Sequence, residues 1–340
     1  YNVAVRGGSN NTIYSVSFHG SNKEGIYKND NLNTYGGRLS LETDLTKGIK
    51  IGTNASYSES KRNFSLSDEF YWYTQPFVVR PDLPIKNSAG DYNKIDEIGM
   101  MGGNGLYSPN PVAMLNMKNS HESSQLLANA YAEFSIYKGL KFRADYGHTN
   151  YKYESSYFRP IITQQDQSIL GESPISTLTL WNGIYKTSTA NFQVDYKLDT
   201  GKHNINALLG YGTERTRNVL TTLTYEGFPN DEVLNNVASA KWSSGQNQIL
   251  QKHGLNSWFT RLNYGYFNKY FAEFSFRADA SSKFGPNNQW GYFPAFSAAW
   301  VASQENFFKH FRWLDNLKFR ASIGQTGSAN IDDFSYRQYY

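Results

Sequence analysis

The chain has 340 residues, with 33 lysines and arginines against 29 aspartates and glutamates, which gives a formal net charge of +4. It contains no cysteine, which excludes disulfide frameworks, thiolate metal sites and cysteine nucleophiles, and the small net charge gives little support for binding nucleic acid. Aromatic residues make up 16% of the sequence although its mean hydropathy is -0.60, and no apolar run reaches the ~18 residues that a transmembrane helix needs.

Alternation of apolar and polar residues with period two dominates the sequence. Ile49, Ile51 and Ala55 fall on one parity, and Lys50 and Asn54 fall on the other. In a β-strand these parities face opposite sides. The pattern predicts about twelve strands, at 2–7, 12–20, 35–45, 49–61, 123–136, 140–154, 185–198, 203–216, 256–266, 270–280, 291–301 and 316–325. A thirteenth strand is expected to begin near Phe334, and a short helix is expected over Glu305–Phe311.

The predicted connections alternate between short and long. The short ones are 8–11, 46–48, 137–139, 199–202 and 267–269, and the long ones are 21–34, 62–122, 155–184, 217–255 and 281–290. In an antiparallel meander, alternate turns lie at opposite ends of the sheet, so the short turns gather at one end. This asymmetry is typical of an outer-membrane β-barrel, whose apolar parity faces lipid and whose polar parity faces a wet lumen. The rings expected at the membrane interfaces are those of Tyr137, Tyr196, Tyr270 and Trp300.

A soluble β-sandwich is the alternative fold, because its strands also alternate. Sandwich strands usually have ~5–6 residues, whereas those predicted here are nearer ~10. The apolar parity is also rich in Ala, Tyr, Phe and Thr, whereas a dry core prefers Val, Ile and Leu. The hairpins should place Glu133 opposite Arg143 and Asp44 opposite Lys50, as pairs on the polar side. These features favour the barrel.

No catalytic or nucleotide-binding motif is present. None of the six histidines is spaced i, i+4 from another, and the sequence has no P-loop, no H-E-x-x-H and no G-x-S-x-G. The acidic neighbours Asp68 and Glu69, Asp231 and Glu232, and Asp332 and Asp333 are interpreted as solvated loop residues. A calcium site that includes Asp68 or Asp231 stays open, although the spacing is not that of an EF-hand.

An aromatic cluster lies early in the longest predicted loop, at Phe70, Tyr71, Trp72 and Tyr73. Dense rings on a loop can stack on sugars or pack against a protein partner. They can equally form a small core that keeps the loop folded. Both interpretations stay open.

Two runs of the sequence resemble signatures of SusC/RagA-type TonB-dependent outer-membrane transporters. Residues 276–294 read FRADASSKFGPNNQWGYFP, and residues 314–327 read LDNLKFRASIGQTG. Weaker matches are VRGGS at 5–9, EGI at 24–26, NPVA at 110–113 and HNINALLGY at 203–211, all in the expected order.

The resemblance implies a nutrient importer in the outer membrane of a Bacteroidota-like Gram-negative bacterium. Its cargo would be a bulky nutrient, a glycan in preference to a peptide. A SusD-like surface lipoprotein would act as lid, and TonB would supply the energy. The family barrel has about 22 strands and a plug. Residues 1–340 are therefore expected to form one partial barrel domain, with the plug, the TonB box and the C-terminal strands absent.

Eight polar residues on the lumen parity are candidates for contact with cargo: Asn54, Asn129, Arg143, Asp145, Gln193, Arg261, Glu273 and Arg320. Each could instead dock the plug or simply hydrate the wall. Residues Phe70–Tyr73 are candidates for contact with the lid. We expect no enzymatic activity, cofactor, metal or nucleic-acid partner. A passive structural or adhesive barrel and a soluble glycan-binding β protein remain the alternative functions.

Overall fold

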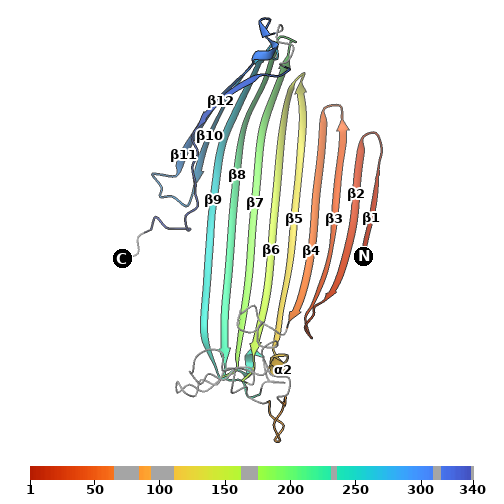
Figure 1. Ribbon diagram of the computed structural model, residues 1–340, viewed down its shortest axis with the longest axis vertical. Coiled ribbons are helices and arrows are strands. Elements are labelled where there is room, and N and C mark those ends of the chain that lie inside the picture. The colour runs from red at the N-terminus through yellow and green to blue at the C-terminus, as the bar shows by residue number, and fades with distance from the viewer. Residues whose placement is uncertain (65–83, 93–110, 162–174, 231–235, 309–314, 338–340) are drawn as a thin grey trace.

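The computed structural model describes residues 1–64, 84–92, 111–161, 175–230, 236–308 and 315–337. These residues form one antiparallel sheet of twelve strands, in which sheet order follows chain order (Figure 1). The strands are β1 Asn2–Gly8, β2 Thr12–Glu24, β3 Asn31–Thr46, β4 Ile49–Phe64, β5 Lys118–Tyr137, β6 Leu140–Arg159, β7 Thr177–Asp199, β8 His203–Glu226, β9 Trp242–Tyr266, β10 Tyr270–Ser281, β11 Trp290–Val301 and β12 Lys318–Gly324. Helix α2 (Pro111–Met114) and the 3-10 turns η3 (Val237–Ser239) and η4 (Ala302–Gln304) are the labelled helical elements of this part. The expected all-β meander is confirmed.

The short and long connections lie at opposite ends of the sheet, as expected. In Figure 1 the short turns are at the top, the opposite ends of β5–β9 reach the bottom, β10 and β11 end part-way down, and β11 and β12 meet at the top. Gly48 and Gly139 close two short turns with φ of +96° and +81°, a conformation that glycine adopts without strain. Phe267 and Asn268 both have positive φ between β9 and β10, the geometry of a two-residue hairpin turn.

The strands extend much further toward the long-loop end than the sequence pattern predicts. β7, β8 and β9 have 23, 24 and 25 residues. Much of the loops expected at 155–184 and 217–255 is therefore strand, so these loop assignments are wrong. The physical reason is that these extensions lie beyond the apolar band of the sheet. Both parities are then polar, as at Thr221 and Thr222, and the alternation fades while the pairing continues.

Two expected elements near the C-terminus are also wrong. Residues 333–336 form a turn, in which Arg337 donates its backbone N–H to the carbonyl of Phe334, so no strand begins there. The helix expected from Glu305 does not begin there: η4 ends just before Glu305, which is extended, and a turn follows before the 3-10 conformation of Phe308. Residues 309–311 of that expected helix lie outside the described residues.

Directly paired residues share a face, so the register shows that the apolar parity is continuous across the sheet. Phe134 lies opposite Phe142, Phe142 opposite Val194, and Val194 opposite Leu209. The outward Phe274 and Phe319 are 44% and 54% exposed. No second sheet covers this face within the described residues, which form a single sheet, so they do not form a β-sandwich.

Aromatic rings gather on the outward face near the short turns. Tyr137 and Tyr196 lie close to the ends of their strands, and Tyr270 lies directly opposite Trp300. The Trp300 ring stacks on Phe319 at 5.7 Å between centroids. Within the described residues, no helix combines the length and the apolar character needed to cross a bilayer.

Small buried cores occur only near the long-loop end of the described residues. Met114 and Met117 pack with Tyr27 and Tyr157. A second cluster joins Phe158, Leu178 and Phe228, with the rings of Phe158 and Phe228 edge to face at 5.4 Å. The sheet is thus covered by packed side chains only near its long-loop end, within the described residues.

Arginine at Leu209 should destabilise the inserted protein by ~2–4 kcal/mol, because a cation at mid-bilayer depth loses its hydration. Leu208→Arg should destabilise the protein far less, since Leu208 lies on the polar face opposite Asp195. Both variants, expressed from the complete gene, are compared by urea unfolding in phospholipid vesicles. Equal destabilisation would contradict the assignment of the two faces.

Glu305 ties the connection between β11 and β12 to the short-turn end of the wall. Its carboxylate accepts hydrogen bonds from the Tyr270 hydroxyl at 2.6 Å and from Trp300 Nε1 at 3.3 Å. Lys269 forms an ion pair with it at 3.3 Å. The hydrogen bond from Tyr270, followed by those from Trp300 and Lys269, lowers the pKa of Glu305 below its ordinary value.

A lowered pKa means that Glu305 stabilises the fold at neutral pH and that this contribution is lost as the pH falls through the folded-state pKa. Glu305→Gln should therefore be less stable than the wild type near neutral pH. The difference should close below the ordinary glutamate range, ~4.3. Unfolding midpoints measured over a pH series test this. A difference that does not change with pH would refute the role of the charge.

Candidate functional site

All eight candidate lumen residues lie on the polar face of the sheet, which we name the inner wall. The register brings two pairs of them directly together: Asn54 lies opposite Asn129, and Arg143 lies opposite Gln193. Arg261 and Glu273 form an ion pair at 3.7 Å on neighbouring strands. Asp145 contacts Arg143, and Arg320, which lies opposite Ala299, has no ion-pair partner among the described residues. The candidates are therefore distributed along the wall and do not converge on one point.

A network of charged and aromatic side chains occupies the inner wall near the short turns. Lys50 Nζ lies 2.6 Å from Glu42 Oε1, and the Tyr131 hydroxyl donates to Glu42 Oε2 at 2.5 Å. The Arg143 guanidinium stacks over the Tyr131 ring at 4.1 Å and binds Asp145 through two nitrogens. Sequence reasoning missed Glu42, Lys50 and Tyr131 as site residues, although all three fall on the polar parity.

Acids and bases are paired along much of the inner wall. The expected cross-strand neighbours Glu133 and Arg143 are confirmed by the register and lie 3.9 Å apart. The expected pair of Asp44 and Lys50 is also confirmed, again at 3.9 Å. Exposed ion pairs contribute only ~0–1 kcal/mol each to folding stability, so these pairs do little to hold the sheet together. Their main effect is on charge: where they occur, the inner wall is rich in hydrogen-bonding groups but close to electrically neutral.

Inward rings lie flat against the wall because glycines face them on the neighbouring strands. Tyr131 covers Gly52 and Phe259 covers Gly210, and a Cβ on either glycine would overlap the ring. The Phe259 ring is also approached by the guanidinium of Arg277 at 6.0 Å. The glycines thus keep bulky rings from projecting into the lumen.

Amides line a depression of about 300 Å³ on the inner wall. Asn54 and Asn129 share it with Arg38, Thr187 and Thr189. Asn129 also donates to the backbone carbonyl of Tyr146 at 3.3 Å, which holds its side chain. This depression brings together the asparagines that the sequence selected.

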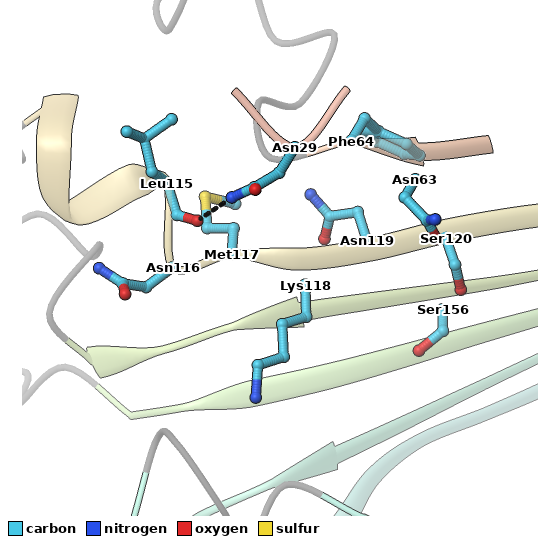
Figure 2. Close-up of a pocket in the computed structure, with 10 residues that line it drawn as sticks. All are labelled: Asn29, Asn63, Phe64, Leu115, Asn116, Met117, Lys118, Asn119, Ser120 and Ser156. Carbon is cyan, nitrogen blue, oxygen red and sulfur yellow. Dashed lines mark hydrogen bonds between the residues drawn. The ribbon is translucent and has the colours of Figure 1, made fainter. Parts of the chain in front are cut away.

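A larger pocket, of about 490 Å³, lies at the long-loop end of β4 and β5 (Figure 2). Its lining residues are Asn29, Asn63, Phe64, Leu115, Asn116, Met117, Lys118, Asn119, Ser120 and Ser156. Asn29 donates to the Leu115 carbonyl at 3.1 Å, the bond drawn in Figure 2. Sequence reasoning missed this pocket because residues 118–120 fall inside a predicted loop.

Asn119 is the unusual member of this pocket. It is 4% exposed, and neither its Oδ1 nor its Nδ2 has a hydrogen-bond partner among the described residues. Buried polar groups are nearly always paired, so an unpaired amide marks a place where a partner fits. An amide offers both a donor and an acceptor, which matches the hydroxyl group of a polar ligand.

Other sequence candidates lie outside the described residues. These are the aromatic cluster Phe70–Tyr73 and the acidic residues Asp68, Glu69, Asp231 and Glu232. In the ranges that the structure does describe, no group of three or more histidine, aspartate or glutamate side chains could hold a metal ion.

Comparison with known proteins shows what the chain is similar to. No protein-family profile matches it. It is 27% identical to the TonB-dependent receptor P3 of Formosa agariphila, over 98% of this chain and 33% of that protein. It is 26% identical to the TonB-dependent receptor SusC of Bacteroides thetaiotaomicron, over 100% of this chain and 35% of that protein. The RagAB peptide importer in its open-open state matches with a TM-score of 0.77 at 23% identity, over 98% of this chain and 37% of that one.

These matches confirm the resemblance to SusC/RagA-type TonB-dependent receptors, which are outer-membrane proteins. The chain spans about a third of the length of the curated relatives that it matches. The twelve-stranded sheet accordingly has the fold of part of the RagAB structure that it matches.

Gly210→Ala should destabilise the protein by ~1–3 kcal/mol, because the new Cβ forces the Phe259 ring away from the wall. Gly265→Ala is the matched control, since a Cβ there meets Phe271 at an ordinary 3.4 Å. Adding Phe259→Ala to Gly210→Ala should recover part of the loss. Urea unfolding of the detergent-solubilised protein measures all three variants. Equal effects of the two glycine substitutions would refute the ring-on-glycine packing.

Proposed function

We propose that the protein takes part in TonB-dependent import of a bulky glycan across the outer membrane of a Bacteroidota-type bacterium. The observation that carries this proposal is the two-faced wall. Its outward side chains are apolar and exposed, and its inner wall carries amides, hydroxyls and paired charges. The similarity to TonB-dependent receptors over nearly the whole chain supports the same function.

The electrostatics of the inner wall favour a glycan over a peptide. Arg143, Arg261 and Arg277 each have an acidic partner on the wall, so they are already neutralised. A peptide brings its own charged ends, whereas a neutral oligosaccharide needs hydrogen-bond partners for its hydroxyl groups, such as the amides of Asn119 and Asn129. The RagAB structures are described as a peptide importer, but their identity to this chain is low and supports the fold alone.

The proposed mechanism assigns residues 1–340 to the barrel domain as a partial wall, with the plug and the TonB box supplied by other parts of the protein. A SusD-like surface lipoprotein would cover the mouth at the long-loop end, where Phe70–Tyr73 are the proposed contacts. TonB would pull on the plug and admit the cargo. The eight lumen candidates would then offer successive hydrogen bonds along its path. No catalytic step is assigned to the chain.

Uptake of a fluorescently labelled oligosaccharide by cells that carry the complete gene should stop when a protonophore collapses the inner-membrane proton gradient. TonB-dependent import requires that gradient, whereas passive diffusion through an open barrel does not. Uptake that continues unchanged would favour a passive barrel. Recovery of the protein from the cell without detergent would favour a soluble glycan-binding protein.

Asn119→Leu should lower oligosaccharide uptake, because it removes the unpaired amide from the pocket. Asn182→Leu is the matched control, since Asn182 is exposed on β7 and does not line that pocket. Equal uptake by the two variants would remove the pocket from the cargo path. Loss of uptake of short peptides but not of oligosaccharides on gene deletion would overturn the choice of cargo.

A further inference from the structure

The outward apolar band of β7 ends at a defined point on the side of the long loops. Its outward side chains run from Leu198 through Val194 to Ala190, and the next outward residues are Ser188 and Lys186. A tilted strand crosses the hydrocarbon in ~9–11 residues, so the crossing is complete near Ala190. Lys186 therefore lies at the level of the outer-leaflet headgroups.

Cations follow this boundary across the adjacent strands. Lys186 lies directly opposite Arg217, and Arg217 lies directly opposite Lys252. Arg215 occupies the outward position two residues closer to the band on β8. We name Lys186, Arg215, Arg217 and Lys252 the outer basic cluster. Like charges placed directly opposite each other destabilise a sheet, so this arrangement calls for an anion.

No carboxylate of the described residues forms an ion pair with the outer basic cluster. This differs from another cation of the same face. Lys61, which also faces outward, pairs with Glu122. The nearby Asp333 is held by His253 at 3.0 Å and by Lys283 at 3.8 Å.

The outer basic cluster lines a depression of about 570 Å³. His148 lines this depression on the side of the apolar band and shares a hydrogen bond of 2.9 Å with Ser188. The rings of Phe334 and Tyr336 line the same depression. All four members of the cluster are exposed, so the charges are open to a ligand. Charges and rings together fit a phosphorylated sugar.

We propose that the outer basic cluster binds the phosphate groups of a phosphorylated glycolipid in the outer leaflet. The proposal rests on the outer-membrane location assigned under the proposed function. The position of the cluster at the end of the apolar band favours a lipid over a free anion. The acyl chains of a lipid would cover Tyr146, Phe192 and Tyr211 on the adjacent band, while its phosphates meet the cations. A bidentate guanidinium such as those of Arg215 and Arg217 suits phosphate oxygens.

Titration of the purified, complete protein with phosphorylated lipid A in detergent micelles tests the proposal. Removing a basic residue near an anionic lipid should weaken binding about fivefold, so Lys186→Gln with Arg217→Gln should weaken it roughly 25-fold. Lys252→Gln alone should weaken it about fivefold, and it is the fallback if the double variant does not fold. Lys61→Gln is the matched control and should leave binding unchanged, since Glu122 already neutralises Lys61.

Dephosphorylated lipid A and inorganic phosphate complete the experiment. Both should bind far more weakly than phosphorylated lipid A. Equal binding of dephosphorylated lipid A would overturn the proposal, as would equal binding of inorganic phosphate, which would indicate a free-anion site. Loss of a co-purifying acidic protein without loss of lipid would assign the cluster to a protein partner instead.

Lipid binding by the purified protein requires neither cargo nor a proton gradient. Failure of oligosaccharide uptake with intact lipid binding would therefore count against the import function alone. Intact uptake with no charge-dependent lipid binding would count against the outer basic cluster alone.

Discussion

The structure depends on one constraint, the direct antiparallel pairing of each strand with the next. Pairing satisfies the backbone hydrogen bonds, and in hydrocarbon no other partner is present for them. It also makes residues that face each other share a side, so the parity of one strand fixes the parity of its neighbours. The outward row from Phe134 to Leu209 and the inward row from Glu133 to Gln193 both follow from this register.

The sequence predicts this constraint well where lipid and lumen differ. The hairpin that joins β5 and β6 could be placed from alternation alone, and the opposition of Glu133 and Arg143 follows from its turn. The extent of β7–β9 could not be predicted, because Thr221 and Thr222 face opposite sides and are both polar. The turn at Phe334 is closed by a local hydrogen bond from Arg337 that alternation does not report, and the extended Glu305 has a tertiary contact with Tyr270. The pocket around Asn119 joins segments far apart in the chain, such as Asn29 and Ser156, and no local pattern reports on that.

Two groups of basic residues on opposite faces of the sheet differ in how their charges are paired. On the inner wall, Arg143 and Arg277 bind the aspartates two residues further along the same strand, so the neutralising groups are part of the strand itself. On the outward face, Lys186 and Arg217 have no such partner in the described ranges. The difference is consistent with the surroundings proposed for these two groups, since a lumen must let a solute leave again, whereas a membrane surface can supply permanent counter-ions.

The unequal lengths of β9 and β10 have a consequence for the rim. β10 pairs with β9 only as far as Leu255, so Trp242–His253 have no β10 residue beside them. A peptide group without a strand partner is tolerated where water can solvate it, and forbidden where only acyl chains surround it. The step in the sheet therefore requires a polar environment, and at its beginning Asp333 of the C-terminal segment supplies one by contacting His253.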